Sequence, residues 1–368
     1  MKDSTEPVRD PFEEYRQAAD PTLRERLSAW QTAIGLQAVD GLKTSNYLKE
    51  VAGRNIEGEI SVSAAQELIE SYYKTSRKQE QPRTDEADIV SARISAILQE
   101  QGFSFSPAQY LSIHRRLFEG IYKHAGKIRD YNISKSEWVL DGDAVIYGGW
   151  QELRATLEYD FNREKAFRYE GLSMDEVIRH LAVFVSRLWQ IHVFGEGNTR
   201  TTAVFFILYL RSLGFTVTND VFRENAWYFR NAMVRANYTN LQKGVHETTD
   251  YLELFLRNLL LGEEHPLQNR TMHIRGEFVK QDIGEKKQDI DRILGAGLPK
   301  KSASNAILLF ERFGFEQIFS RPDVMEILSI TPSPASELLR KLQAAEVIEP
   351  LSGMGKGKYR FSPTFFRS

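Results

Sequence analysis

Apolar side chains recur every three or four positions along most of the chain, which is the period of an amphipathic helix. Each of these segments would bury one face and leave the other in water. The period is clearest in residues 63–73, 86–100, 106–121, 153–162 and 173–190. The pattern therefore predicts a mainly α fold.

Residues 137–149 break the helical period. Two short apolar runs flank Asp141-Gly142-Asp143, as in two strands joined by a turn. We expect a β-hairpin there, inside the helical domain. Its candidate residues are Trp138, Val139, Leu140, Val145, Ile146 and Tyr147. Packing in the core explains the apolar members of this set equally well.

The helical pattern weakens again over residues 263–300 and then resumes in a small C-terminal unit. Helical segments at 305–313, 321–328 and 335–345, with a turn at 331–334, precede two apolar runs within 347–361 that are interrupted by a Gly-rich stretch at 352–355. This order is typical of a winged helix-turn-helix. We expect domains at 1–84, 85–262 and 301–368, with a linker or helix at 263–300.

Composition narrows the functional classes only a little. The 368 residues are 42% hydrophobic, enough for a full core, and the net charge of −2 offers no general attraction for nucleic acid or an anionic membrane. The absence of cysteine excludes disulfides and a cysteine nucleophile. A polar N-terminus and a longest apolar run of only 203–210 predict a cytoplasmic protein without a membrane segment.

The candidate chemistry gathers between two apolar helices, in the run His192-Val193-Phe194-Gly195-Glu196-Gly197-Asn198-Thr199-Arg200. Gly195 and Gly197 can adopt positive φ, which turns backbone N–H groups inward, and the N-terminus of the next helix adds partial positive charge. Such a loop is suited to phosphate. Arg200 would neutralise a terminal phosphate, and Asn198 would bond phosphate or fix the loop.

Glu196 is the one anion of this loop. A carboxylate beside a phosphate site is explained if it binds Mg²⁺, which prefers oxygen ligands. The alternative interpretation is a glycine-capped helix turn with a chance histidine.

Three further histidines, His114, His124 and His180, have no second ligand at close spacing, so a zinc site is not predicted.

The loop resembles the signature of the Fic family, His-x-Phe-x-(Asp or Glu)-Gly-Asn-(Gly or Lys)-Arg. Residues 125–132 are similar to the segment before the flap of that family, and the expected hairpin lies where the flap belongs. The resemblance covers roughly residues 85–262. It implies a helical core with a β-hairpin flap, an N-terminal helical extension and, in this chain, an added C-terminal unit.

The resemblance also implies an activity, the transfer of AMP from ATP to a Tyr, Ser or Thr hydroxyl of a protein, the target being another protein or the chain itself. His192 would be the general base and Glu196 the Mg²⁺ ligand, while Phe194 anchors the loop. The flap would align the target as an added strand. The residues implied for the nucleotide are Gly195, Gly197, Asn198, Thr199, Arg200, Tyr228 and Asn231, although helix packing explains the last two equally well.

Two departures from the signature leave the branch of the family open. Thr199 stands where Gly is usual and where the kinase-like Doc branch has Lys, so phosphate transfer is an alternative to AMP transfer. Ala203 stands where many members have a second arginine for the γ-phosphate. Either another basic residue does that work or the nucleotide is oriented less firmly than usual.

Many members of the family also carry an inhibitory helix with the form (Ser or Thr)-x-x-x-Glu-(Gly or Asn). Glu57-Gly58 has the last pair, but Gly53 stands at the first position. Glu57 is therefore an inhibitory candidate. A helix that simply ends at Gly58 is the alternative.

The partner of the C-terminal unit stays open at this stage. Residues 301–368 carry nine basic and seven acidic side chains, a small excess for a DNA-binding module. DNA binding, protein contact and homodimer formation are all compatible with it. The sequence thus leaves two classes of function, a nucleotide-using transferase and a DNA-binding regulator that senses nucleotide. An intact His192 favours the enzyme, because a sensor needs no general base.

Overall fold

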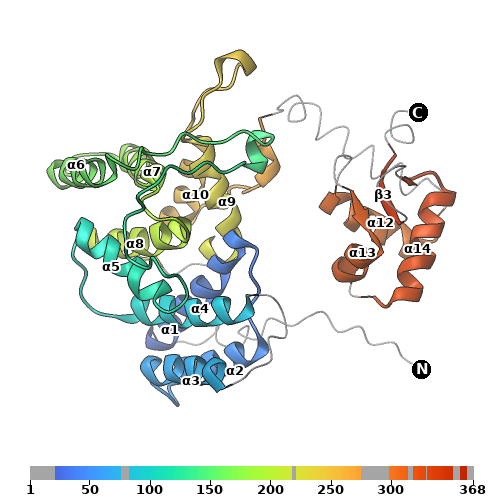
Figure 1. Cartoon of the computed structure of the whole chain (residues 1–368), viewed down its shortest axis with the longest axis horizontal. Helices are drawn as coiled ribbons and strands as arrows, with labels where there is room; N and C mark the ends of the chain where they lie inside the picture. The colour runs from blue at the N-terminus through green and yellow to red at the C-terminus, as the bar shows by residue number, and fades with distance from the viewer. Residues whose placement is uncertain are drawn as a thin grey trace. The chain divides into compact units, whose positions relative to one another are not determined.

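The computed structural model describes residues 21–75, 83–217, 221–274, 298–313, 318–328, 330–350 and 357–362. The chain divides into two compact units, Met1–Arg275 and Gly276–Ser368, which are considered separately. Helices dominate both units, as Figure 1 shows, so the mainly α fold expected from the sequence is confirmed. None of the described helices has the length and apolar character needed to cross a membrane.

The N-terminal helices of the first unit form a small bundle. Its members are α1 (Pro21–Gly35), η2 (Leu36–Asp40), α2 (Asn46–Glu57), α3 (Val62–Thr75) and α4 (Thr84–Gln99). Their apolar faces meet around the buried Trp30, whose ring N–H donates to Asn55 Oδ1 at 2.9 Å. α4 packs against α1 and α3 inside the bundle and against α5 and α8 outside it, and so links this bundle to the rest of the unit.

The remainder of the first unit surrounds one buried helix, α8. The elements are α5 (Pro107–Phe118), η3 (Trp138–Leu140), α6 (Leu153–Ala166), α7 (Met174–Ile191), α8 (Asn198–Ser212), α9 (Val221–Arg235), η4 (Leu241–Lys243), α10 (Asp250–Leu261) and η5 (Asn269–Met272). Every residue of α8 from Asn198 to Leu210 is buried, because α5, α7, α4 and η2 all pack against it. Its first turn therefore lies inside the unit, where charged groups are costly unless they are paired.

The segment 136–148, called the flap below, is only partly the β-hairpin that the sequence predicts. One antiparallel bridge joins Ser136 to Ala144, and residues 144–147 are extended with alternating burial. The first predicted strand is wrong, because Trp138–Leu140 form the 3-10 turn η3. The carbonyl of Glu137 accepts two N–H groups from within the same turn, so these groups are unavailable to a β-ladder.

The second unit contains α12 (Lys300–Phe313), β1 (Phe319–Ser320), α13 (Arg321–Leu328), α14 (Pro332–Ala344), β2 (Ile348–Pro350) and β3 (Lys358–Phe361). The strands form an antiparallel sheet in the order β1-β3-β2. The expected turn at 331–334 is shorter than predicted, since α14 already starts at Pro332, a position in the first helical turn that proline tolerates. The predicted wing tip at 352–355 lies outside the described residues, and the winged-helix interpretation stays a prediction.

Candidate functional site

The loop with the candidate chemistry joins the C-terminus of α7 to the N-terminus of α8. His192 caps the C-terminus of α7 and has a φ of 52°, the left-handed conformation that residues other than glycine seldom adopt. The side chain of Asn198 holds the loop closed, because it accepts from the N–H of Phe194 at 3.0 Å and donates to the carbonyl of Phe194 at 2.7 Å. Of the two roles expected for Asn198, the structure shows the one that fixes the loop.

The two glycines of the loop are needed for different reasons. Gly197 has a φ of 74°, and a Cβ there would lie 2.4 Å from the ring of Phe118. Gly195 does not have the positive φ that we expected. Its constraint is steric, since a Cβ would lie 2.5 Å from the hydroxyl oxygen of Tyr131. The loop therefore admits no larger residue at either position without displacing its neighbours.

Buried side chains support the loop from beneath. Phe194 is fully buried, as expected, and stacks on His114 with 3.7 Å between the ring centroids. The Nδ1 atom of His114 accepts from the N–H of Gly126 at 2.8 Å, which leaves Nε2 to donate to the carbonyl of Glu196 at 3.0 Å. These contacts need a neutral imidazole, and burial lowers the pKa of His114 to about 4.

We expect this neutral His114 to make stability depend on pH. Because the folded-state pKa lies below the usual value of about 6.5, the unfolded chain binds a proton between pH 6.5 and 4 that the folded chain does not. The free energy of unfolding should then fall with falling pH across that window, with a slope approaching ~1.4 kcal/mol per pH unit for one such group. Urea titrations of His114→Gln at several pH values should show a smaller slope than the wild type. An unchanged slope would contradict the assignment.

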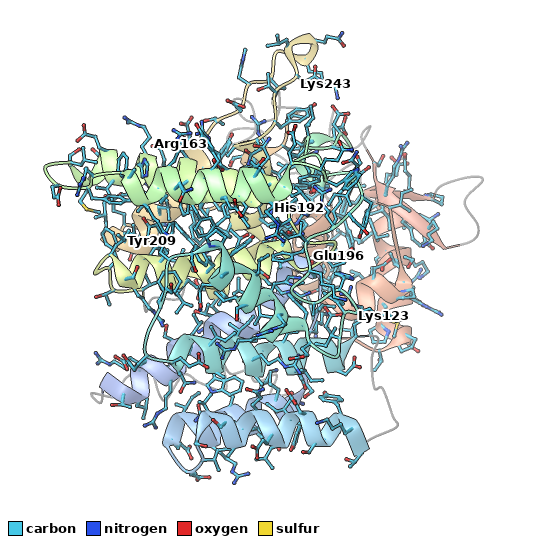
Figure 2. The ribbon with its side chains drawn as sticks, turned by 60° about the vertical axis from the view of Figure 1, so that its left-hand side comes forward. Lys123, Arg163, His192, Glu196, Tyr209 and Lys243 are labelled. Carbon is cyan, nitrogen blue, oxygen red and sulfur yellow. The ribbon has the colours of Figure 1, made fainter. Side chains whose placement is uncertain are left out.

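His192 is enclosed, although Figure 2 shows it near the exposed Glu196. Its exposed fraction is 3%, and neither ring nitrogen has a hydrogen-bond partner. The ring of Tyr147 covers it with 4.1 Å between centroids, and Trp189 contacts it edge-on. Burial lowers the pKa of His192 well below its usual value, and the positive charge of Lys135 lowers it further. At neutral pH the imidazole is uncharged and can accept a proton.

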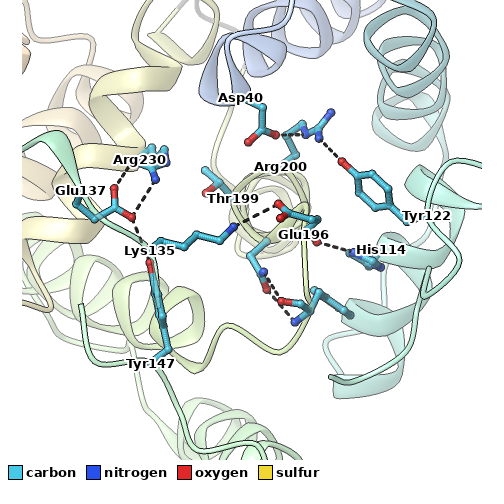
Figure 3. A network of polar contacts seen from close by, with 12 residues as sticks. Asp40, His114, Tyr122, Lys135, Glu137, Tyr147, Glu196, Thr199, Arg200 and Arg230 are labelled. Atoms are coloured by element: carbon cyan, nitrogen blue, oxygen red, sulfur yellow. Dashed lines mark hydrogen bonds and ion pairs between the residues drawn. The ribbon is translucent and has the colours of Figure 1, made fainter. Parts of the chain in front are cut away.

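A buried ion pair fixes the residue that covers His192. Glu137 is 1% exposed and pairs with Arg230 of α9, with 2.7 Å between Nη1 and Oε2. The hydroxyl of Tyr147 donates to Glu137 Oε1 at 3.2 Å. Figure 3 shows these three side chains in a row on the side of the loop where Lys135 lies. The flap is thus anchored to α9 directly above the candidate base.

The other predicted flap residues divide into two groups. Val139, Leu140 and Val145 are buried in the core of the unit, so the packing interpretation is correct for them. Trp138 and Ile146 are 43% and 85% exposed, respectively. These two side chains are the members of the set that a protein target can touch from solvent.

Glu196 carries an exposed carboxylate at the mouth of the loop. It forms an ion pair with Lys135 of the flap, with 3.2 Å between Nζ and Oε2. Among the described residues no group of three or more His, Asp or Glu side chains is close enough to bind a metal ion. A cation at Glu196 would therefore take its remaining ligands from phosphate and water, which is the usual coordination of Mg²⁺.

Arg200 does not point to the mouth of the loop. It is 0% exposed, and in Figure 3 its guanidinium turns toward Asp40 and Tyr122, away from Lys135. Nε lies 2.8 Å from Asp40 Oδ2, and Nη2 lies 2.8 Å from Glu86 Oε1. Asp40 and Glu86 belong to η2 and α4, so the N-terminal bundle occupies the arginine expected to bind phosphate.

Two more of the arginine's neighbours complete this environment. Nη1 donates to Gln37 Oε1 at 3.0 Å, and the guanidinium carbon lies 4.8 Å from the ring centroid of Phe118. Thr199, the residue before it, accepts from the ring N–H of Trp189 at 3.0 Å. The side chains of Thr199 and Arg200 therefore bind groups inside the protein. An anion at the first turn of α8 would be bound by the backbone N–H groups of that turn.

The structure places Tyr228 and Asn231 on the buried side of α9. Tyr228 is 1% exposed and stacks parallel to Phe255 of α10. Asn231 donates to Asn269 Oδ1 at 2.8 Å, while its own Oδ1 is buried without a partner. Packing accounts for Tyr228. The nucleotide role of the pair stays a prediction, with the unpaired acceptor of Asn231 as its support.

Glu57 lies at the end of α2, where the structure shows the helix terminus that was the alternative interpretation. Gly58 follows with a φ of 83°, and its N–H bonds the last turn of α2. The side chain of Glu57 is exposed, whereas Arg200 is fully buried. The acidic groups that the N-terminal bundle brings to Arg200 are Asp40 and Glu86 instead.

Comparison with known families agrees with this geometry. Residues 104–210, from just before α5 into α8, match the Fic/DOC family model. No curated protein matches the chain. The chain thus contains a Fic/DOC family domain at residues 104–210, and such domains typically transfer a nucleotide or a phosphate group to a protein.

Proposed function

We propose that this protein transfers AMP from ATP to a hydroxyl group of a protein, with His192 as the general base. The observation that carries the proposal is the state of His192, which is buried, uncharged and without a partner at either ring nitrogen. A buried polar group without a hydrogen bond is costly, and such groups are concentrated where a ligand or a reaction uses them. Here the group lies at the start of a loop that ends at a helix N-terminus.

The residues around the loop fit a nucleotide with Mg²⁺. The backbone N–H groups at the start of α8 would face phosphate, and the exposed carboxylate of Glu196 would bind the metal. Bound there, Mg²⁺ would supply positive charge that offsets the phosphates. Lys135 would be freed from Glu196 by the metal and could then contact phosphate. In this proposal the lysine would do the work of the arginine absent at Ala203.

The proposed reaction is a displacement at phosphorus and changes no oxidation state. The target hydroxyl gives its proton to the neutral ring of His192, and its oxygen bonds to the α-phosphorus of ATP. The bond from that phosphorus to the bridging oxygen breaks, and diphosphate leaves. Positioning and neutralisation of charge supply most of the acceleration.

The target must enter from the flap side. Tyr147 covers His192, so a hydroxyl reaches the base only when this ring moves. The exposed Trp138 and Ile146 would then contact the target, while extended residues 144–147 offer backbone groups for pairing. The second unit could bind DNA, another protein or a second copy of the chain. Each of these partners stays a proposal.

Intact-protein mass spectrometry after incubation with ATP and Mg²⁺ tests the proposal. A gain of one AMP on the chain or on an added protein substrate supports AMP transfer. A gain of one phosphate would assign the Doc-like activity instead. No gain on any protein, with ATP bound, would favour the regulator that only senses nucleotide.

Replacing Glu196 by alanine should remove the dependence on Mg²⁺ together with most of the activity. The carboxylate is the loop's one exposed acidic group, so no second described ligand can compensate. Lys135 loses its partner in this variant, and Lys135→Ala is therefore the matched control, since it breaks the same ion pair and keeps the metal ligand. In titrations of the transfer rate with Mg²⁺, Glu196→Ala should lose the dependence on the metal, whereas Lys135→Ala should keep it at a lower maximal rate, because its contact with phosphate is lost. Full activity of Glu196→Ala without metal would refute the ligand assignment.

A further inference from the structure

Arg129 is a buried arginine whose side chain donates to backbone carbonyls. It lies before the flap, is 4% exposed, and has no carboxylate within ion-pair distance in the described part of the chain. Its Nε donates to the carbonyl of His192 at 2.7 Å, Nη1 to that of Tyr131 at 2.5 Å, and Nη2 to that of Gly148 at 2.5 Å. Its own backbone N–H donates to the carbonyl of Val193 at 2.9 Å.

These carbonyls belong to three segments that are far apart in the sequence. Tyr131 precedes the flap, Gly148 ends it, and His192 ends α7. The last carbonyls of a helix have no partner inside the helix, and a positive charge there is favourable. One guanidinium therefore ties both ends of the flap to the terminus of the helix that carries the candidate base. Burying a guanidinium without a carboxylate is costly, so its position here is set by these acceptors.

The backbone of His192 needs such a contact. Its φ of 52° is unfavourable for a residue with a side chain. The flap end also approaches closely, since a Cβ at Gly148 would lie 3.1 Å from the carbonyl oxygen of Ile191. Arg129 bonds the carbonyl of His192 itself, and so it fixes the direction in which the imidazole leaves the chain.

We propose that Arg129 is a positioning residue that holds the imidazole of His192 in its reactive direction and makes the flap and the base move together. The inference rests on the proposed function. The contacts that shape the phosphate side of the loop do not include Arg129: Asn198 bonds Phe194, and His114 bonds the carbonyl of Glu196. Loss of Arg129 should therefore misplace the base and leave nucleotide binding intact.

The kinetic test uses Arg129→Lys and Arg129→Ala in the full chain. Lysine keeps the charge but cannot donate in several directions from a planar group. For both variants kcat for AMP transfer should fall about 100-fold, the typical effect of a displacement of about 1 Å at a reacting group. KM for ATP should change less than about twofold, and millimolar methylguanidine should restore part of the activity of Arg129→Ala.

Arg93 supplies the matched control. It is another largely buried arginine that donates to backbone carbonyls, those of Leu117 at 3.1 Å and Glu119 at 2.7 Å, and it also pairs with Glu70 at 3.0 Å; it contacts neither the flap nor His192 in the described part of the chain. Arg93→Lys should lose stability in a comparable way, with an unchanged kcat per folded molecule. An equal loss of kcat in Arg93→Lys and Arg129→Lys would overturn the proposal, because it would show a general effect on folding.

A second measurement does not depend on catalysis. In protein labelled with ¹³C-histidine, His192→Ala identifies the His192 signals, and the Cα shift of His192 reports its backbone conformation. In Arg129→Lys these signals should move, whereas those of His180, remote from the loop and bound to Glu164, should stay. Unmoved His192 signals would overturn the positioning role. If the wild-type protein transfers no AMP, the proposed function is wrong. The His192 signals in Arg129→Lys then still show whether Arg129 positions His192.

Discussion

Replacing His192 by alanine is expected to abolish AMP transfer while ATP still binds. The imidazole is the group proposed to take the proton of the target hydroxyl, and loss of a general base typically costs about 10²–10⁴-fold in rate. The phosphate side of the loop is held by Asn198 and His114, which the substitution does not touch. Transfer rates by mass spectrometry and ATP affinity by calorimetry measure the two properties separately.

His246→Ala is the control for this experiment. The side chain of His246 is exposed and lies outside the loop, so its removal should leave both rate and affinity unchanged. Removing the ring of His192 also takes away the surface on which Tyr147 packs, and a small change of melting temperature is expected. Undiminished transfer by His192→Ala would rule out the mechanism. Loss of ATP binding would show instead that the ring shapes the nucleotide site.

Local signals account for the parts of the fold that the sequence predicts well. α7 has a strong apolar period and starts with a capping box between Ser173 and Glu176, so its predicted range of 173–190 is close to the observed helix. α13 spans the predicted 321–328. In such helices the hydrogen bonds and the buried face are set within a few residues, and neighbours in space are not needed to find them.

The structure of the flap depends on contacts that a local sequence pattern does not contain. Apolar residues at 138–140 favour a strand, but their backbone groups find partners elsewhere: the carbonyl of Val139 accepts from the N–H of Ile274 at 3.0 Å. Gln190 of α7 likewise donates to the carbonyl of Ile146 at 3.1 Å. Both partners are distant in the sequence, so no local pattern could predict that they replace a β-ladder.

The candidate site divides in the same way. His192, Phe194 and Asn198 were predictable because they lie in one loop with a recognisable spacing. Arg129 and the Glu137–Arg230 pair were missed, since each acts on the loop from a segment separated from it by tens of residues. One sequence signal does point to Glu137: its carboxylate stands beside apolar positions that are expected to be buried. A buried carboxylate requires a partner of opposite charge. The sequence does not say which arginine supplies it.

The orientation of Arg200 is the largest difference between the expected and the observed site. Its place in the signature predicts a phosphate ligand, whereas its guanidinium lies among Gln37, Asp40 and Glu86. A contact with phosphate would require these groups to release it, at the cost of opening a buried ion pair. The N-terminal bundle and the loop are thus coupled through one side chain.

Replacing Glu86 by alanine should be the most destabilising single change in this part of the chain. The variant leaves the fully buried Arg200 with Asp40 as its remaining acidic partner, and breaking a buried ion pair from one side costs about 3–5 kcal/mol. Burial opposes the charge of Glu86, but hydrogen bonds from Arg83, Arg200 and Tyr122 outweigh it and lower the pKa of Glu86. Its stabilising effect is therefore present above its unfolded pKa and is lost as the pH falls through the lowered folded value.

Urea unfolding followed by tryptophan fluorescence measures this effect, because all tryptophans lie in the first unit, at positions 30, 138, 150, 189 and 227. Arg83→Ala is the control: it removes a half-exposed partner of the same carboxylate and should cost less than about 1 kcal/mol. The double variant Glu86→Leu with Arg200→Met removes both buried charges, and it should be more stable than Glu86→Ala, since Asp40 can turn to water. Equal losses in Glu86→Ala and Arg83→Ala would show that Glu86 stabilises the surface contact rather than the buried arginine.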